Sequence, residues 1–473
     1  MNPVRFHING RLTKAFVRAD MTVLEWLRSN PQTCGSKEGC AEGDCGACSI
    51  LLARPGSDAG DFGAVNSCIM LMGQIEGCSL ITVEGLSPNE SERHPVQVDM
   101  AENGSSQCGF CTPGIVMSLA GLLNKNANPN DEQIHDALAG NLCRCTGYRP
   151  IVEAAKSAAD KSINQLAKLA GDTIASDDAS NVIGSEDSVF FRPKTLAELC
   201  LIRSEHPGSA LLAGGTDLGL GVAEAKTRWP IAIVTAGVGE MLQIDEFDDH
   251  ISFGGAVTWE RALPHLHRHY PSFANMVRRF GSTQVRNMGT IAGNIGNASP
   301  IGDGPPALIA LGASVVLANV DGEREILLED FCTGYRQTVL ADDEVISKIK
   351  LPLPKAAQQF RVYKISKRYD QDISTVCGAF SVEINDDGAI ANAHVAFGGM
   401  AATSQRCPGA EAALNGNQLG MDLVASVSSA INAHFSPLDD WRGSANYRGV
   451  VAANLFERFV RDVAGETVEV MAL

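Results

Sequence analysis

Three closely spaced cysteines carry the strongest chemical signal in this sequence. Cys40, Cys45 and Cys48 follow a C-x4-C-x2-C spacing near the N-terminus. Thiolates are soft ligands that suit iron, and this is a spacing by which [2Fe–2S] clusters are held. Zinc sites favour paired C-x2-C motifs instead, so we expect iron here. Gly43 and Gly46 let the loop backbone fold closely around the sulfurs and direct N–H groups at them.

The fourth ligand of this set has two candidates. Cys68 lies 20 residues after Cys48, and Cys78 lies 30 residues after it. Residues 65–67, Val-Asn-Ser, precede Cys68 and indicate a turn that returns the chain to the cysteine loop. We therefore expect Cys68 to complete the set.

A second set of cysteines follows. Cys108 and Cys111 form C-x2-C, and Cys143 and Cys145 form C-x-C. Taken alone, these four thiols suit zinc as well as iron. Together the two sets offer eight thiols in two groups of four, which suggests two one-electron centres in series. A protein with such centres usually moves electrons.

Composition places these cysteines in a soluble protein. The formal charge of -17 argues against a nucleic-acid or anionic-membrane surface. Neither a signal-peptide pattern nor a run of about 18 apolar residues occurs, so we expect a cytoplasmic protein with reduced thiols. Six further cysteines are scattered singly and are expected to be buried structural thiols: Cys34, Cys78, Cys200, Cys332, Cys377 and Cys407. Cys34 is the exception, because it lies six residues before the first expected ligand, Cys40.

The elements that position the cysteines can be predicted in order. Strands at 3–8 and 14–17 flank the turn Asn9-Gly10, a helix follows at 21–28, and strands return at 49–53 and 80–84. This order is the one expected of a β-grasp ferredoxin. From 88 to 160 the pattern becomes helical, with helices over 112–123, 131–138 and 151–160. The second cysteine set lies at helix ends of this small bundle.

Two glycine-rich segments stand out in the second half. Residues 211–218, LLAGGTDL, follow a strand and can wrap a diphosphate with backbone N–H groups. They do not match G-x-G-x-x-G, so a Rossmann fold is not indicated. Residues 290–303, TIAGNIGNASPIGD, combine small residues, polar side chains and a carboxylate suited to a ribose hydroxyl or adenine. Either segment alone is more often an ordinary turn.

The cysteine neighbourhoods carry a family resemblance. The strings QCGFCTPG (107–114) and GNLCRCTGY (140–148) resemble the iron–sulfur region of the xanthine dehydrogenase and aldehyde oxidase family of molybdenum hydroxylases. The resemblance implies a [2Fe–2S] cluster in each set, with the helical one nearest the molybdenum cofactor and the ferredoxin-like one toward a flavin. It also implies that Gln107 touches a pterin; the alternative is an ordinary polar residue at a helix start.

The glycine-rich segments resemble the FAD domain of the same family, a vanillyl-alcohol-oxidase-like fold. This implies FAD contacts for Phe280, beside the ring, and for Asp303, at the adenosine end; an ordinary core role is the alternative for Phe280. The stretch 364–373 departs in part from the family pattern, which leaves the electron acceptor open. The remaining implied FAD contacts are Leu211, Leu212, Ala213, Gly214, Gly215, Thr216, Asp217, Leu218, Thr290, Ile291, Ala292, Gly293, Asn294, Asn297, Ile346 and Lys364.

The expected fold is therefore multidomain α+β. We expect a β-grasp ferredoxin-like [2Fe–2S] domain over 1–87, a small four-helix-type [2Fe–2S] domain over 88–160 and a linker over 161–187. A vanillyl-alcohol-oxidase-like FAD domain follows over 188–355, then a C-terminal α+β domain over 356–473. The resemblance stops where single-chain members of the family continue into a molybdenum domain. It thus implies the small subunit of a two-subunit enzyme.

The function implied is electron transfer from a large molybdenum-cofactor subunit, which oxidises hypoxanthine and xanthine to urate. The electrons pass through two [2Fe–2S] clusters to FAD and on to NAD+, in a heterotetramer of two small and two large subunits. One alternative is a molybdenum hydroxylase that acts on an aldehyde or N-heterocycle. Others are a stand-alone NAD(P)H-dependent iron–sulfur flavoprotein reductase and a zinc-binding scaffold. We expect no nucleic-acid or membrane partner.

Overall fold

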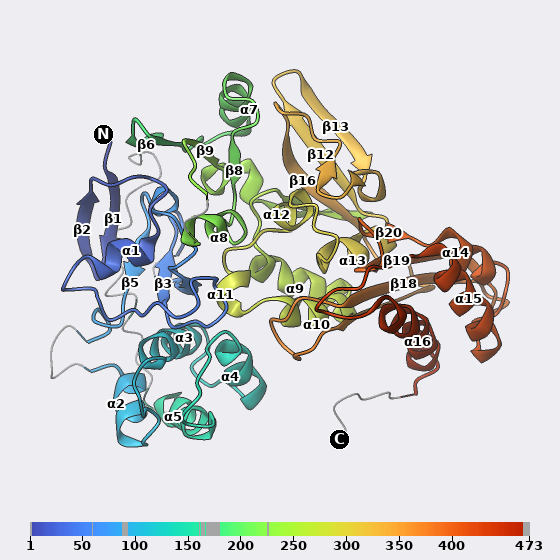
Figure 1. Cartoon of the computed structure of the whole chain (residues 1–473), viewed down its shortest axis with the longest axis horizontal. Coiled ribbons are helices and arrows are strands. Elements are labelled where there is room, and N and C mark those ends of the chain that lie inside the picture. Colours follow the sequence, from blue (N-terminus) through green and yellow to red (C-terminus); the bar gives the residue numbers. More distant parts are fainter. Residues whose placement is uncertain are drawn as a thin grey trace. The chain divides into compact units, whose positions relative to one another are not determined.

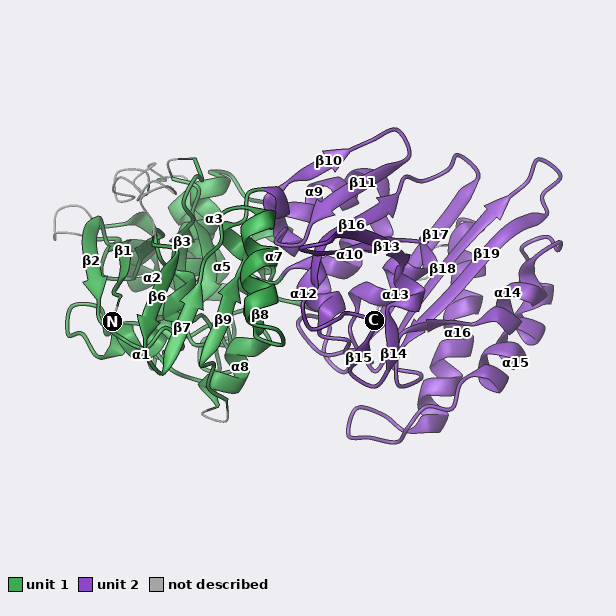
Figure 2. Cartoon of the chain, turned by 90° about the horizontal axis from the view of Figure 1, so that it is seen from above, with its two compact units in different colours: residues 1–239, 281–289 green, residues 240–280, 290–473 purple. Residues whose placement is uncertain are grey.

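The computed structural model describes residues 2–58, 60–87, 93–159, 161, 166, 180–224 and 227–466 (Figure 1). The chain forms two compact units, each described separately below (Figure 2). Unit 1 comprises Met1–Gly239 and Gly281–Gly289, and unit 2 comprises Glu240–Phe280 and Thr290–Leu473. None of the helices in these described ranges is long and apolar enough to cross a membrane.

Unit 1 begins with the expected β-grasp sheet. Asn9 and Gly10 have φ of 50° and 78°, as a two-residue hairpin turn requires, and place Ile8 opposite Arg11. The second strand therefore starts at Arg11, three residues before the predicted 14. Helix α1 begins with a capping box between Thr22 and Glu25. The sheet order is β2-β1-β5-β3-β4, with bounds β1 Val4–Ile8, β2 Arg11–Ala15, α1 Val23–Arg28, β3 Ser49–Ala53, β4 Gly63–Asn66, η1 Met72–Gln74 and β5 Ser79–Ile81.

Four helices follow, as the helical pattern predicts. Pro113 lies in the first turn of α3, where its missing N–H removes no helical hydrogen bond. The apolar face of α3 packs with Leu51 and Ile81 of the sheet in one buried cluster. The helices are α2 Pro95–Glu102, α3 Thr112–Lys125, α4 Asp131–Leu138 and α5 Arg149–Ala159.

Unit 1 also contains the first part of the expected FAD domain. The strand order β6-β7-β9-β8 forms a separate four-stranded sheet. Phe190 and Val234 of this sheet share one hydrophobic cluster with Phe6 and Val23 of the β-grasp domain. This shared core is why the range 188–355, expected as one domain, is divided between the compact units. The elements are β6 Val182–Ser185, β7 Ser188–Phe191, α7 Leu196–Glu205, β8 Ala210–Leu212, α8 Leu218–Ala223, β9 Ile231–Val234, η3 Thr235–Gly237 and, farther along the chain, α11 Thr283–Arg286.

The expected linker over 161–187 is described only at 161, 166 and 180–187. Strand β6 occupies 182–185, so the last residues of that range belong to a sheet rather than to a linker. Val182 to Ser185 pair antiparallel with β7, which satisfies their backbone groups. The rest of the predicted linker lies outside the described residues.

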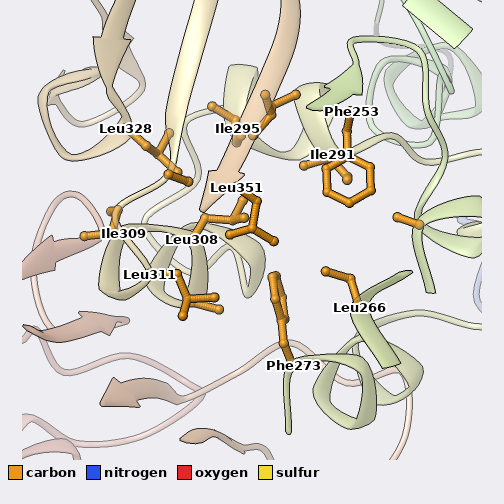
Figure 3. Close-up of a cluster of buried hydrophobic side chains, with 14 of the residues drawn as sticks. Phe253, Leu266, Phe273, Ile291, Ile295, Leu308, Ile309, Leu311, Leu328 and Leu351 are labelled. Carbon is orange, nitrogen blue, oxygen red and sulfur yellow. The ribbon is translucent and has the colours of Figure 1, made fainter. Parts of the chain in front are cut away.

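Unit 2 is built on two antiparallel sheets that share a core. The first has the order β10-β11-β16-β12-β13 and the second β17-β18-β19-β20. Figure 3 shows Phe253, Phe273, Ile291 and Leu308 in the buried cluster beside the first sheet. Phe360 of the second sheet belongs to the same cluster. The first sheet and its neighbours are η4 Glu240–Leu242, β10 Ile244–Glu246, β11 His250–Gly254, α9 Trp259–His269, α10 Pro271–Phe280, α12 Ile291–Gly296, α13 Gly304–Ala310, β12 Ser314–Asn319, β13 Gly322–Leu327, η5 Leu328–Asp330, β14 Cys332–Gly334, β15 Gln337–Thr338 and β16 Val345–Pro352.

The C-terminal part is α+β, as expected, with four strands followed by the helices. Its helices cover the second sheet around Phe380 and Phe456, both fully buried. Its elements are β17 Gln358–Ile365, β18 Val376–Ile384, β19 Ile390–Gly398, β20 Gln405–Arg406, α14 Pro408–Leu414, η6 Met421–Leu423, α15 Val424–His434 and α16 Ala445–Val463.

Candidate functional site

The first cysteine loop points backbone N–H groups at its sulfurs, as the glycines indicate. The Cys40 Sγ accepts hydrogen bonds from the N–H groups of Glu42 at 3.3 Å, Asp44 at 3.4 Å and Cys45 at 3.3 Å. The Cys45 Sγ accepts one from the N–H of Cys40 at 3.4 Å. Such donors stabilise negative charge on sulfur, so this loop suits thiolates.

Two glycines give this loop its shape. Gly43 and Gly46 have φ of 76° and 67°, in the left-handed region that favours glycine. At Gly46 a Cβ would collide with the carbonyl oxygen of Gly140 and would lie 2.5 Å from the Asn141 Nδ2. Gly46 is therefore required both for the turn and for the close approach of the second cysteine loop.

Cys48 and Cys68 lie together, buried with Leu24 and Ile69. Cys78 instead lies in the core of the β-grasp domain, where its Sγ is 3.8 Å from the carbonyl oxygen of Gln74. The structure thus brings Cys68, and not Cys78, to the loop.

The four thiols of this set are arranged in two pairs. A hydrogen bond with Cys45 lowers the pKa of Cys40 to about 5 and raises that of Cys45. A hydrogen bond with Cys68 lowers the pKa of Cys48 and raises that of Cys68. Two thiolates for each of two irons is the ligand distribution of a [2Fe–2S] cluster, so the pairing fits that cluster.

The second set is paired in the same way. The Sγ atoms of Cys108 and Cys145 are 3.2 Å apart. Burial and a hydrogen bond with Cys143 raise the pKa of Cys111 to about 12. The Tyr148 hydroxyl accepts a hydrogen bond from the N–H of Cys143 at 2.8 Å and so fixes the loop.

In the described part of the chain, no group of three or more His, Cys, Asp or Glu side chains is arranged to hold one metal ion.

Two direct hydrogen bonds join the two cysteine loops. The N–H of Leu142 donates to the carbonyl oxygen of Cys45 at 2.9 Å. The Nδ2 of Asn141 donates to the carbonyl oxygen of Gly46 at 3.1 Å. Cys45 of the first set and Cys143 of the second are therefore separated by one residue and one hydrogen bond.

The outer side of the second set faces solvent in this chain. Cys108 and Cys145 are exposed, as is Gln107. Two large apolar side chains beside them are also exposed, Phe110 by 49 % and Leu142 by 55 %. Gln107 is therefore exposed beside Cys108, in a part of the chain with exposed apolar side chains.

The glycine-rich segment 211–218 lies at the end of β8 and the start of α8 in unit 1. Gly215 has a φ of 77°, and a Cβ on Gly214 would collide with the carbonyl oxygen of Met288. The Nε2 of Gln74, from the β-grasp domain, donates to the carbonyl oxygen of Gly214 at 3.1 Å. This backbone suits close approach to a diphosphate, as expected of the segment.

This segment adjoins the first cysteine set. Gly219, in the first turn of α8, lies so close to the carbonyl oxygen of Ile69 that a Cβ would collide with it. Ile69 follows Cys68 directly and packs with it in one buried cluster. The segment expected to bind flavin and a cysteine expected to be a ligand are thus neighbours within unit 1.

The second expected flavin segment belongs to unit 2. The Thr290 hydroxyl caps α12 by accepting the N–H of Gly293 at 2.9 Å. The Oδ1 atoms of Asn294 and Asp303 are buried and have no hydrogen-bond partner among the described residues. Buried oxygens of this kind need a donor, and FAD hydroxyl and amide groups supply donors, so these residues fit FAD. Asn297, also expected to contact FAD, follows at the C-terminal end of the same helix.

Asp303 and Lys364 form a buried ion pair. The Lys364 Nζ lies 2.5 Å from the Asp303 Oδ2 and donates to the Ser374 Oγ at 3.0 Å. Both charged side chains are at most 5 % exposed. The sequence indicated both residues separately but not their pairing. A lysine between Tyr363 and Ile365 in a strand is the signal that indicates a buried anionic partner.

The last two expected flavin contacts lie in the core of unit 2. Phe280 ends α10 half-buried, with its ring 5.1 Å from that of Trp259 in an edge-to-face contact. Ile346 is buried in β16 at a register shift, and its Cδ1 lies near Gly296 of α12. Their contacts fit the core role as well as the flavin role, so the flavin assignments remain predictions.

Comparisons with known protein families match three parts of the chain. A [2Fe-2S] binding domain matches residues 82–156, and an FAD binding domain in molybdopterin dehydrogenase matches 183–354. A CO dehydrogenase flavoprotein C-terminal domain matches 361–463. The FAD match begins at 183, five residues before the boundary we expected.

Curated relatives and solved structures agree with these matches. Xanthine dehydrogenase from Emericella nidulans is 30 % identical over 98 % of this chain and 39 % of its own length. That from Drosophila pseudoobscura pseudoobscura is 32 % identical over 90 % of this chain and 36 % of its own. This chain therefore spans well under half the length of these relatives.

Among solved structures, carbon monoxide dehydrogenase from Hydrogenophaga pseudoflava is 25 % identical over 59 % of this chain and 98 % of the matched chain, with a TM-score of 0.56. Quinoline 2-oxidoreductase from Pseudomonas putida 86 is 22 % identical with a TM-score of 0.54, a likeness of fold. The chain carries the iron–sulfur and FAD-binding domains of the molybdenum hydroxylase family.

Proposed function

We propose that this chain is the electron-transfer component of an NAD+-dependent xanthine dehydrogenase. In this proposal a partner subunit oxidises hypoxanthine and xanthine to urate at molybdenum. Electrons enter at the Cys108/Cys111/Cys143/Cys145 set, pass to the Cys40/Cys45/Cys48/Cys68 set and continue to FAD and NAD+. Support for the substrate comes from relatives named xanthine dehydrogenase, which match up to 98 % of this chain.

The observation that carries the proposal is the serial order of the sites in unit 1. Leu142, beside Cys143, donates a hydrogen bond to Cys45 at 2.9 Å. At the other end of the first set, Ile69, beside Cys68, contacts Gly219, which directly follows the flavin segment. The first set therefore lies between the second set and the flavin segment along a continuous series of contacts.

The residues of this chain suit each step of that series. The clusters supply one-electron transfer, and FAD, when bound, converts it to two-electron transfer. The N–H groups of Glu42 and Asp44 at the Cys40 sulfur stabilise the added negative charge of a reduced cluster. In unit 2 the unpartnered Oδ1 atoms of Asn294 and Asp303 are positioned to accept hydrogen bonds from the flavin nucleotide.

The surface at which electrons would enter supports a partner subunit. Gln107, Phe110 and Leu142 are exposed and lie within three residues of Cys108 or Cys145 in the sequence. An exposed apolar face beside a redox ligand suits docking of a protein partner. The match to carbon monoxide dehydrogenase covers 59 % of this chain and 98 % of the matched chain. A separate chain of that size supports a molybdenum hydroxylase whose domains are divided among several chains. We extend the proposal to a cytoplasmic heterotetramer of two small and two large subunits.

A second candidate is the same role in another molybdenum hydroxylase. The match to carbon monoxide dehydrogenase, at 25 % identity and a TM-score of 0.56, favours it. In that case the partner acts on a different substrate, such as an aldehyde or an N-heterocycle, and the acceptor can differ from NAD+. The chemistry within this chain is unchanged.

Anaerobic stopped-flow absorbance of the purified chain tests the proposal. NADH should bleach the flavin first and the clusters afterwards, because electrons enter the chain in reverse at FAD. Xanthine added to this chain alone should reduce nothing, while xanthine added with the co-purified molybdenum subunit should reduce the clusters before the flavin. Flavin that NADH leaves oxidised would exclude NAD+ as the acceptor, and xanthine turnover by this chain alone would overturn the division between subunits.

A further inference from the structure

A short segment, Gly281–Gly289, belongs to unit 1 although the chain on both sides of it belongs to unit 2. It carries the short helix α11, which begins after the cap residue Ser282. Figure 1 shows α11, yellow by its place in the sequence, next to the blue and teal elements β3 and α3. Neither cysteine set lies on this segment, so its role is separate from that of the ligands.

Gln284 is fully buried in this segment, as are Ser282 and Arg286. Its Nε2 donates to the Ser118 Oγ at 2.8 Å and to the Asn141 Oδ1 at 2.9 Å, and it lies 3.4 Å from the Ser49 Oγ. Ser49 follows Cys48 of the first set, and Asn141 precedes Cys143 of the second by two residues. One amide therefore contacts the ligand loops of both sets.

Gln284 also influences the two hydrogen bonds between the cysteine loops. Gln284 holds the Oδ1 of Asn141, and the Nδ2 of the same amide donates to the carbonyl oxygen of Gly46 at 3.1 Å. Asn141 is buried, so its orientation is set by these two contacts. Its neighbour Leu142 donates to Cys45 at 2.9 Å.

Two further side chains of the segment tie it to both domains. Arg286, fully buried, donates from Nη2 to the Asp136 Oδ2 of α4 at 2.9 Å. Asn287 donates from Nδ2 to the carbonyl oxygen of Ala64 in β4 at 2.8 Å. The segment therefore holds the helical domain on one side and the β-grasp domain on the other.

Glycines on the facing loops make room for these side chains. A Cβ on Gly140 would lie 2.8 Å from the Cδ of Gln284, and one on Gly63 would lie 3.1 Å from the side chain of Asn287. Both distances are too short for an ordinary carbon contact. The segment is thus seated in space that any larger residue at 140 or 63 would close.

We propose that Gln284 is a positioning residue that fixes the distance between the two cluster sites, and with it electron transfer from one cluster to the other. This inference rests on the proposed function, because it requires a [2Fe–2S] cluster in each set. Electron tunnelling falls steeply with distance, so an amide that locks Asn141 between the two loops controls the step that joins them. The chain continues from this segment directly into Thr290, where the second flavin segment begins.

The variant Gln284→Met tests the role, because methionine has a similar length but donates no hydrogen bond. Two reduced clusters held close together split each other's electron paramagnetic resonance signals. In Gln284→Met we expect both signals to remain and the splitting to be lost. Hydrogen exchange at the Leu142 amide should become faster, a readout that needs no cofactor. The matched control is Gln32→Met, an exposed position, which should change neither measurement.

Ser118→Ala is a milder second variant, which removes one partner of Gln284 and leaves both loops intact. It should narrow the splitting and speed exchange at Leu142 to a smaller extent. An unchanged splitting in both variants would overturn the proposal, as would loss of a cluster in Gln284→Met together with unchanged splitting in Ser118→Ala. Failure of the premise that each set holds a cluster is distinct from these outcomes, because the unaltered chain would then lack one or both signals. Failure of the xanthine or NAD+ assignment would leave both signals in place and would show only in the stopped-flow test.

Discussion

Gly46→Ala tests how closely the two cysteine loops must approach. Gly46 has a φ of 67°, where an alanine costs about 1–2 kcal/mol from backbone conformation alone. Its Cβ would also lie 2.5 Å from the Asn141 Nδ2 and would collide with the Gly140 carbonyl oxygen. The second loop must then move away, at a cost of about 1–3 kcal/mol for overpacking. The two hydrogen bonds between the loops, at Gly46 and Cys45, contribute about 1 kcal/mol each when lost.

Gly56→Ala is the matched control, because Gly56 has a similar φ of 80° and no atom lies within 4 Å of the position that an alanine Cβ would occupy there. Conformational cost is common to both variants, so their difference reports the approach of the loops alone. We expect Gly46→Ala to lose about 3–5 kcal/mol more than Gly56→Ala.

The assay is thermal unfolding of the full chain, followed by the loss of visible absorbance from the clusters. An excess of about 3 kcal/mol corresponds to a midpoint roughly 6–12 °C lower for a unit of this size. Hydrogen exchange at the Leu142 amide should be faster in Gly46→Ala and unchanged in Gly56→Ala. Equal midpoints for the two variants would refute the close packing of the loops.

Three further predictions concern the flavin site, acid stability and the ligands. Asn294→Leu should weaken FAD binding about tenfold, measured by fluorescence titration, and leave the apoprotein no less stable, because it removes a buried unpartnered oxygen; unchanged affinity would count against the FAD contact. Burial lowers the pKa of His94 to about 4, below its unfolded value of 6.5, so its contribution to stability is complete above pH 6.5 and is lost as the pH falls to about 4. This loss of unfolding free energy amounts to about 3 kcal/mol. His94→Asn keeps an acceptor for the helix cap and should abolish this pH dependence of the unfolding free energy, measured with urea between pH 7 and 4.5. The same pH dependence in the variant as in the unaltered chain would contradict the assignment to His94. Cys45→Ser should abolish one cluster signal in electron paramagnetic resonance and spare the other, whereas Cys34→Ser, at an exposed thiol outside both sets, should affect neither.

Local signals were sufficient to predict much of unit 1. The Asn9-Gly10 turn indicates a hairpin, and φ values of 50° and 78° confirm it. Pro113 indicates the start of a helix, and α3 begins at Thr112. The turn expected at 65–67 is wrong in its position, because Val65 and Asn66 end β4 and the turn covers 67–69, but it correctly indicates that Cys68 lies beside Cys48. Each of these features depends on residues close together in the sequence.

Features that depend on distant residues could not be predicted in this way. Gln284 contacts Ser49, 235 positions away, and no periodic pattern over 281–289 indicates that this segment leaves its neighbours to join unit 1. Lys364 pairs with Asp303, 61 positions away, although each was expected at the flavin site. The single FAD domain expected over 188–355 is divided for the same reason, because Phe190 packs in a core that begins at Val4.

Iron and flavin analysis of the anaerobically purified chain tests the central claim most directly. Two [2Fe–2S] clusters and one flavin should give about four iron and about one FAD per chain. About two iron per chain, or zinc in place of iron at either set, would contradict the account of this chain as a series of redox centres.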